Sequence, residues 1–284
     1  MSVILAATDG STYATSVYHY AAWAAKKLGT KVAVLHLLDP RHDEPVKADL
    51  SGTIGLGARS ALMEELVELE GARARLMKKR GQAILDHAAQ WLGEAGLTDV
   101  ETEQRHERLS DFIESEQCKA DLVVLGKRGN HADYAKGHLG SNLERVVRSC
   151  RHPVLVASVA QREMKRFVLA YDGGSSARKA LEFAVANPLL RGMQCHLIHV
   201  GEGSSGFGGQ MAEAEEYLRG AGFEVTAKIL PGDPAAVISD VVGKSDIDLL
   251  VMGAYSSSGI RRFFVGSTTS ALIRGVKIPL LLLR

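Results

Sequence analysis

The chain contains two copies of one pattern. Asp121-Leu-Val-Val-Leu-Gly126 recurs as Asp248-Leu-Leu-Val-Met-Gly253, and each copy leads through a loop rich in glycine or serine into Gly-Ser and an amphipathic segment. The segment Leu5-Ala-Ala-Thr-Asp-Gly-Ser11 is likewise matched by Val168-Leu-Ala-Tyr-Asp-Gly-Gly174, at an offset of 163 residues. We therefore infer that one α/β unit was duplicated and fused.

In each half, short β-branched and apolar runs alternate with longer segments of helical period, which is typical of βαβ units around a parallel sheet. This pattern predicts strands near residues 2–8, 31–37, 99–105, 121–126, 153–158, 167–171, 194–200, 223–230, 248–253 and 279–283. It predicts helices near residues 13–28, 60–93, 109–118, 140–150, 175–187, 209–220, 234–244 and 266–275. We expect an α/β fold with two tandem doubly wound, Rossmann-like sheets of five parallel strands, each with a ligand crevice beyond the carboxyl ends of its strands.

A polar stretch, residues 161–165, separates the two halves. The length of 284 residues fits two domains of ordinary size, here residues 1–160 and 165–284. Because the linker is short, we expect the domains to lie against each other. The halves differ mainly after the second strand, where the first domain inserts residues 39–59 before a long helical stretch; this insert is either a lid over the crevice or a solvated loop.

The composition is typical of a soluble globular protein, with 46% hydrophobic and 24% charged residues. The 34 basic side chains balance 33 acidic ones, so we expect no nucleic-acid partner and no attraction to acidic membranes. No apolar run approaches the length of a membrane span, and the first strand begins without a secretory signal. Three scattered cysteines argue against a disulfide framework, and we expect a cytoplasmic protein.

The loop before the last helix of the second domain offers the elements of a phosphate site. A predicted strand ends at Gly253, a loop with Ser256 and Ser257 follows, and Gly266-Ser267-Thr268 opens the helix. Backbone N–H groups and the positive end of a helix dipole suit an anion, and the serine and threonine hydroxyls add donors. The first domain repeats this plan, and in both domains the alternative is structural: the glycines and serines turn the chain into its helix, and the aspartates act as turn or cap residues.

These features together resemble the universal stress protein family in its tandem two-domain form. The resemblance rests on Thr-Asp9-Gly-Ser, on the strand ends Leu-His-Leu37 and Ile-His-Val200, and on the Gly-x2-Gly-x9-Gly-Ser/Thr loop, and it covers almost the whole chain. It implies an adenine-nucleotide alpha hydrolase-like fold. In the ATP-binding branch of the family, the first-strand aspartate and the end of the second strand hold adenosine, and the glycine loop holds ribose and phosphates. The residues so implied are Asp9, Leu37, Gly126, Gly129, Gly140 and Ser141 in the first domain and Asp172, Val200, Gly253, Gly266 and Ser267 in the second.

Neither loop matches the family pattern fully. In the second domain Ser256 replaces the second glycine, but nine residues still separate it from Gly266. In the first domain ten residues separate Gly129 from Gly140, and Asp133 adds negative charge inside the loop. An added residue changes which N–H groups face a phosphate, whereas a serine is tolerated where φ is negative. We therefore expect ATP, ADP or AMP, with or without Mg²⁺, to bind mainly in the second domain.

No catalytic residues and no metal ligands are predicted. The spacing shows no Ser/His/Asp or Cys/His arrangement, and the histidines of residues 131–152 match no established metal pattern. Any ATP turnover should therefore be slow, and we expect a nucleotide-responsive stress module. His36 and His199 occupy equivalent strand ends and are expected to be structural, with a general base as the alternative.

Two other functions stay open. One is an enzyme of the ATP pyrophosphatase or ligase type, although the Ser-Gly-Gly-x-Asp-Ser loop of those enzymes is not found after either first strand. The other is a scaffold that binds no nucleotide or a different ligand. In each case we expect the apolar last strands, near residues 153–158 and 279–283, to pair antiparallel as an intrachain pseudo-dimer, with two chains forming a homodimer.

Overall fold

A computed structural model describes residues 3–40, 56–115, 119–128, 141–201, 207–254 and 267–284, and for residues 56–61 and Ser141 it describes the backbone only. The first half contains β1 (Val3–Ala7), α1 (Ala14–Leu28), β2 (Lys31–Leu37), α2 (Leu56–Glu94), β3 (Val100–Arg105), α3 (Leu109–Glu114), β4 (Leu122–Gly126), α4 (Ser141–Ser149) and β5 (Val154–Ala157). The second contains β6 (Arg166–Ala170), α5 (Ser175–Ala186), the 3-10 turn η2 (Pro188–Leu190), β7 (Gln194–Val200), α6 (Phe207–Gly220), β8 (Val225–Leu230), α7 (Pro234–Lys244), β9 (Leu249–Gly253), α8 (Ser267–Gly275) and β10 (Leu280–Leu283).

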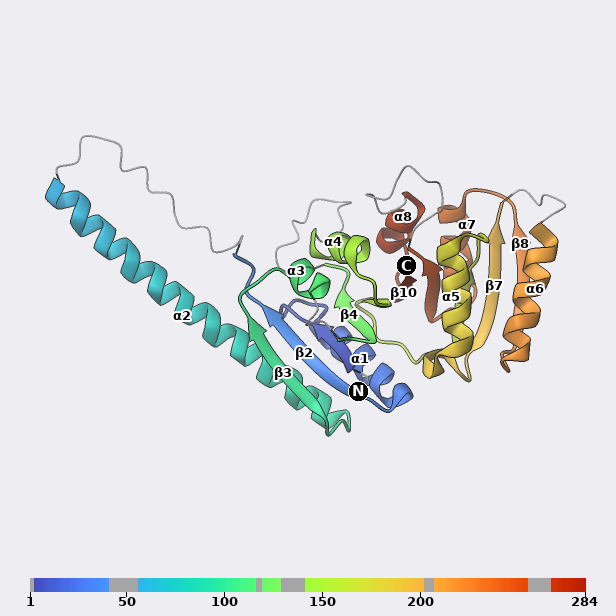
Figure 1. Ribbon diagram of the computed structural model, residues 1–284, viewed down its shortest axis with the longest axis horizontal. Helices are drawn as coiled ribbons and strands as arrows, with labels where there is room; N and C mark the ends of the chain where they lie inside the picture. Colours follow the sequence, from blue (N-terminus) through green and yellow to red (C-terminus); the bar gives the residue numbers. More distant parts are fainter. Residues whose placement is uncertain (1–2, 41–55, 116–118, 129–140, 202–206, 255–266) are drawn as a thin grey trace.

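The predicted α/β architecture is confirmed. The strands form one sheet in the order β3-β2-β1-β4-β5-β10-β9-β6-β7-β8, with five strands from each half (Figure 1). Neighbours are parallel except at the centre, where β5 and β10 run antiparallel and Leu155 lies opposite Leu281. The predicted pairing of the two last strands is therefore confirmed, and each strand covers an apolar edge that the other would expose.

Two apolar layers cover the faces of this sheet. One contains Leu155 of β5, Leu169 of β6 and the buried sides of α1, α2, α5 and α6. The other contains Val156 of β5, Leu250 of β9 and the buried sides of α3, α4, α7 and α8. Alternate residues of a strand point to opposite faces, so strands buried on both sides are apolar throughout, as β4 and β9 are. Both layers continue across the two halves.

The repeated aspartates that open the β4 and β9 motifs have a structural role. The Asp121 carboxylate accepts the backbone N–H of Val3 at 2.6 Å, and the Asp248 carboxylate accepts that of Arg166 at 2.9 Å. Each thus joins the start of one strand to the start of its neighbour. This shared contact gives a physical reason why both copies of the motif begin with aspartate.

The linker between the halves lies on α1. The Ser16 hydroxyl donates to the carbonyl of Val159 at 2.6 Å, and the Tyr20 hydroxyl donates to that of Ala160 at 2.7 Å. Two predicted boundaries are wrong. Helix α2 begins at Leu56, earlier than residue 60, and α3 ends at Glu114, because Ser115 is extended and its hydroxyl donates back to the carbonyl of Phe112.

Candidate functional site

The strand order brings the predicted adenosine residues to one edge of the sheet in each half. Strand β6 lies between β7 and β9, and Ala170 is aligned with Ile198 of β7 and Met252 of β9. Asp172, Val200 and Gly253 follow directly after these aligned positions. The chain runs from β6 to β7 and β8 on one side, and then crosses through α7 to β9 on the other side of β6. The strand order therefore reverses here, which makes this a topological switch point, where open α/β sheets bind ligands.

The first half has the same arrangement. Strand β1 lies between β2 and β4, and the pairs Ala7 with Leu35 and Ala6 with Val124 set their register. Asp9, Leu37 and Gly126 therefore lie at the same edge of the sheet, at the end of adjacent strands. The structure thus assembles one such group of three residues in each unit.

Each of the two aspartates stabilises the turn that follows its strand. Asp9 Oδ1 accepts the N–H of Ser11 at 3.0 Å, and Asp172 Oδ1 accepts the N–H of Gly174 at 2.9 Å. The glycine that directly follows each aspartate has a positive φ, 69° at Gly10 and 73° at Gly173. Glycine adopts this left-handed conformation at little cost. The Oδ1 atoms therefore act as the structural alternative predicted, by holding the turn. For Asp172, which is exposed, Oδ2 has no hydrogen-bond partner among the described residues.

The strand-end histidines form hydrogen bonds with the backbone carbonyls of the residues that precede these aspartates. His36 Nδ1 lies 2.8 Å from the carbonyl oxygen of Thr8, and His199 Nδ1 lies 3.0 Å from that of Tyr171. Because a carbonyl oxygen can only accept, Nδ1 carries the proton in both rings. The predicted structural role of the two histidines is borne out by these contacts.

The strand-end glycines allow β9 to pack closely against the start of α5, and β4 against Tyr13 before α1. A Cβ at Gly253 would lie 2.6 Å from Ser176 Cβ and 2.8 Å from the Ala177 backbone nitrogen. A Cβ at Gly126 would lie 2.7 Å from Tyr13 Cβ. Glycine at these positions is thus explained by packing, whether or not a ligand binds nearby.

The helices that open with Gly-Ser begin where predicted, but only part of each loop can be placed. Helix α8 starts with exposed Ser267 and half-buried Thr268, and it has no acidic residue in its first turn. Helix α4 starts at Ser141 and carries Glu144 in its first turn, which weakens the attraction of that terminus for an anion. The predicted positions Gly129, Gly140, Ser256, Ser257 and Gly266 lie outside the described residues.

Three side chains near the two sites were not predicted. The Phe207 ring stacks on His199 with centroids 3.6 Å apart, and a Cβ at Gly173 would lie 2.6 Å from Gln210 Oε1. Both side chains are at the start of α6, over the Asp172 turn. Lys127 follows Gly126, but its buried amine donates to the carbonyl of Val276 in the other half. Of these three residues only Phe207 had a signal in the sequence, because it is an aromatic residue within the glycine-rich stretch of residues 201–209.

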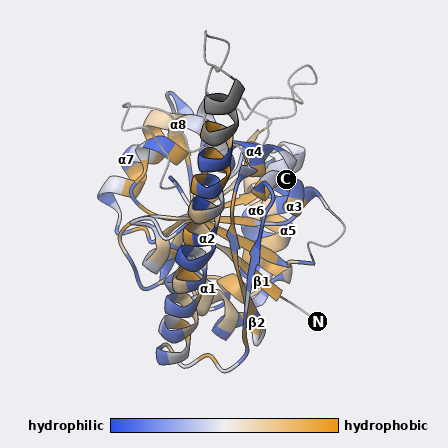
Figure 2. Ribbon diagram, turned by 90° about the vertical axis from the view of Figure 1, so that its left-hand side faces the viewer, coloured by the Kyte–Doolittle hydropathy of each residue, from blue (hydrophilic) through white to orange (hydrophobic). Residues whose placement is uncertain are grey.

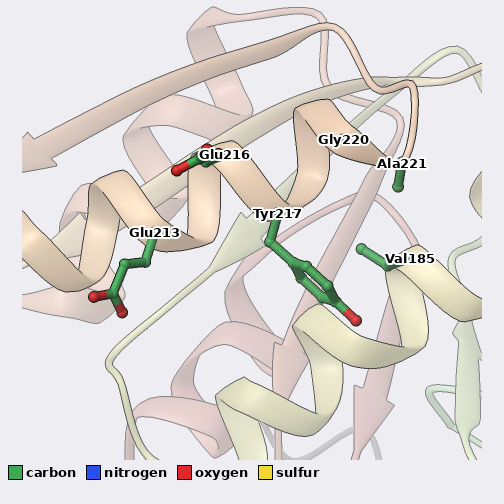
Figure 3. Close-up of a pocket in the computed structure, with 6 residues that line it drawn as sticks. All are labelled: Val185, Glu213, Glu216, Tyr217, Gly220 and Ala221. Carbon is green, nitrogen blue, oxygen red and sulfur yellow. The ribbon is translucent and has the colours of Figure 1, made fainter.

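Two cavities of the described part lie away from these residues. One, of about 480 Å³, separates the C-terminal ends of α5 and α6, where Tyr217 points toward α5 (Figure 3). It is lined by Val185, Glu213, Glu216, Tyr217, Gly220 and Ala221, near the amino ends of the strands. The other, of about 460 Å³, includes Arg162, Asp246 and Lys277. Neither contains a predicted site residue, and both switch-point edges adjoin segments outside the described ranges.

The described residues offer little for covalent or metal chemistry. They contain no group of three or more His, Cys, Asp or Glu side chains able to hold a metal ion. Cys150 and Cys195 are buried, and burial raises the pKa of Cys195, so its thiol stays protonated. Within the same residues, no helix is both long and apolar enough to cross a bilayer.

Comparison with known proteins agrees with this architecture. The sequence model that describes the universal stress protein family matches residues 1–158 and 207–284 of this chain. The chain is 37% identical to universal stress protein Slr1230 of Synechocystis sp. over the full length of both proteins. Among solved structures, a universal stress protein from Archaeoglobus fulgidus superposes with a TM-score of 0.70 at 21% identity, covering 99% of this chain and 96% of that one. A putative universal stress protein from Pseudomonas aeruginosa gives 0.63 at 17% identity, covering 99% and 92%. With two family segments, a repeated fold and a full-length relative, the chain belongs to the universal stress protein family.

Proposed function

We propose that the protein binds an adenine nucleotide at the β6–β7–β9 edge of its second half, between Asp172, Val200, Gly253 and the N-terminus of α8. The observation that carries this proposal is the convergence of Asp172, Val200 and Gly253 at a topological switch point, with the first turn of α8 held at the end of β9 by the bond from the Thr269 hydroxyl to the carbonyl of Ala254. As a member of this family, the protein is proposed to act as a stress-response module with at most slow ATP turnover.

The chemistry of the second half fits the adenosine part of such a ligand. Asp172 is fixed at its turn through Oδ1, which leaves Oδ2 to accept a hydrogen bond from a hydroxyl or amino group of the ligand. Val200 and the Phe207 ring supply half-buried apolar surface beside it, which suits a heterocyclic base.

The phosphate part fits the start of α8. Ser267 and Thr268 lie in the first turn, where unpaired N–H groups and the positive end of the dipole favour an anion. When bound, the nucleotide would bring the negative charge that this terminus lacks. Mg²⁺ with the phosphates belongs to the same proposal, as does a cytoplasmic location.

The first half is the weaker candidate. Glu144 stands in the first turn of α4, where its negative charge disfavours a phosphate. Helix α2 also packs closely over the end of β2, since a Cβ at Gly81 would lie 2.7 Å from His36 Cδ2. We therefore propose one principal nucleotide site per chain.

The first test is to identify small molecules released from the purified, denatured protein by mass spectrometry. An adenine nucleotide at close to one per chain is expected. If neither co-purified nor added nucleotide binds, the scaffold alternative holds instead. Rapid release of pyrophosphate from ATP would favour the enzyme alternative.

The second test is the substitution Asp172→Asn. Asparagine keeps an oxygen that can accept the Gly174 N–H, so the turn is retained, but it replaces Oδ2 with a donor. Loss of one buried hydrogen bond should weaken nucleotide binding by about 1–3 kcal/mol, or roughly fivefold to a hundredfold in Kd.

Asp9→Asn is the matched control, because it makes the same change at the equivalent turn of the first half. Isothermal titration of both variants and the parent protein gives the comparison. Equal losses in the two variants would contradict a site confined to the second half. An unchanged Kd for Asp172→Asn would mean that the carboxylate is only a turn residue.

A further inference from the structure

Helix α2 is the largest difference between the two repeats. It has 39 residues whereas the equivalent α6 has 14, so it is 25 residues longer. Ile84 of α2 contacts the Asp9 turn as Phe207 of α6 contacts the Asp172 turn, so the extra residues precede about residue 81. At 1.5 Å per residue they extend α2 by about 37 Å, and Figure 1 shows that this part leaves the body of the protein.

The protruding part of α2 exposes apolar side chains. Of the eight large hydrophobic residues that the described chain exposes, five lie here: Leu62, Met63, Val67, Leu69 and Leu76. Leu69 and Leu76 are 63% and 67% exposed, whereas Leu85 and Leu92 in the packed part are at most 2% exposed. Figure 2 shows hydrophobic residues interspersed with hydrophilic ones along this helix. A helical segment of about seven turns with this much exposed apolar surface is poorly stabilised in water by itself, so this face needs a partner.

The charges of residues 62–80 are divided between the two ends of this stretch. The first part is acidic, with Glu64, Glu65, Glu68 and Glu70, and the second part is basic, with Arg73, Arg75, Lys78, Lys79 and Arg80. Such a helix is complementary to itself when a second copy runs antiparallel. In a parallel pair, like charges would face like charges.

The complementarity extends to single residues. When two copies are centred between Gly71 and Ala72, Glu64 comes to the level of Lys79, Glu65 to that of Lys78, Glu68 to that of Arg75 and Glu70 to that of Arg73. In the same register Leu66 is level with Met77, and because 11 residues are close to three full turns, both lie on one face of the helix. Every glutamate is thus level with a basic residue of the partner, and one face brings large apolar residues to the same level.

We propose that residues 62–80 of α2 form the interface of a homodimer, in which two copies of this segment pair antiparallel about a twofold axis. Such an interface is isologous and closes on itself. The β5 and β10 edges cannot serve, because they already pair within the chain. The proposed interface therefore assigns dimer formation to a part of the first repeat that has no counterpart in the second.

The test uses the full chain and two charge-reversed variants. In the first, Glu64, Glu65, Glu68 and Glu70 are changed to lysine; in the second, Arg73, Arg75, Lys78 and Lys79 are changed to glutamate. Sedimentation at micromolar concentration should show a dimer for the parent protein and monomers for each variant, with Kd raised at least a hundredfold. Mixing the variants should restore a dimer, because one segment is then entirely basic and the other largely acidic.

A third variant that carries all eight reversals controls for damage to the helix. It keeps the complementarity and should dimerise like the parent protein, with equal helix content by circular dichroism. A monomeric parent protein would overturn the proposal. So would single-set variants that still dimerise, or a mixture that stays monomeric. Nucleotide binding plays no part in these measurements, so their outcome is independent of the proposed function.

Discussion

Lys127 makes the stability of the protein depend on pH in a predictable way. Its amine is buried between the two halves and donates to the carbonyl of Val276. Burial, with a smaller contribution from the nearby charge of Arg128, lowers the pKa of Lys127 to about 8 from the ordinary 10.5. Unfolding returns the amine to water and to its ordinary pKa.

The sign follows from proton uptake. Between pH 8 and 10.5 the unfolded chain binds this proton more tightly than the folded one, so the free energy of unfolding rises with pH. Below pH 8 both states are protonated, and the cost of burying the charge is fully present, at roughly 3 kcal/mol. From pH 7 to pH 9 this cost falls by about 1.4 kcal/mol.

Lys127→Met removes the titrating group and keeps the length of the side chain. The variant loses the bond to Val276, a loss of about 1 kcal/mol, but avoids the larger burial cost, so it should be at least as stable as the parent at pH 7. Its advantage should shrink by about 1.4 kcal/mol at pH 9. Urea unfolding at pH 7, 8 and 9 measures this, with Lys277→Met, at a neighbouring exposed lysine, as the control.

Parallel pH dependences for the parent protein and Lys127→Met would refute the reasoning, because they would mean that the folded and unfolded states bind this proton equally. A control that behaved like Lys127→Met would point instead to a general charge effect. The expected result is a difference seen at Lys127 and not at Lys277.

Two further predictions concern packing and domain structure. Gly253→Ala should destabilise the protein by about 1–3 kcal/mol, since its Cβ would meet the backbone of α5, whereas Gly243→Ala, with open space around it, should be neutral or stabilising in thermal unfolding. Cutting the chain after residue 162 should give fragments that associate with each other through β5 and β10, since each alone exposes an apolar edge. Fragments that sediment as separate monomers after mixing at micromolar concentration would contradict this.

Most of the fold could be read from the sequence because local signals agree with the final arrangement. The repeat aligned β1 with β6 and β4 with β9, and the apolar strands Val154–Ala157 and Leu280–Leu283 indicated their own pairing. The end of α3 was missed because Ser115 ends the helix by its own backbone and side-chain bonds, which helical periodicity does not record.

The contents of the candidate site were less predictable. Asp172, Val200 and Gly253 lie at one edge of the sheet because register follows from strand order, and their role in binding stays a prediction. The bond from Lys127 to Val276 joins residues 149 apart in sequence and depends on how the halves meet, which no local pattern encodes. The helix pattern predicted α2 but not its departure from the sheet, since the apolar period of Leu69 and Leu76 continues through Ile84, which is packed against the first repeat.

The two repeats have kept one set of contacts and diverged in another, and the division separates two roles. The aspartate turn, the histidine on the preceding carbonyl and the close strand-end glycine occur in both halves, so they serve the fold in both and do not by themselves distinguish which half binds the ligand. What differs is what surrounds them. In the second half Phe207 stacks on His199 and α8 begins without an acidic residue, whereas in the first half α4 carries Glu144 in its first turn and α2 extends outward. Duplication would then have allowed one half to keep ligand binding while the other became available for association, and the Asp172 and α2 variants test these two roles separately.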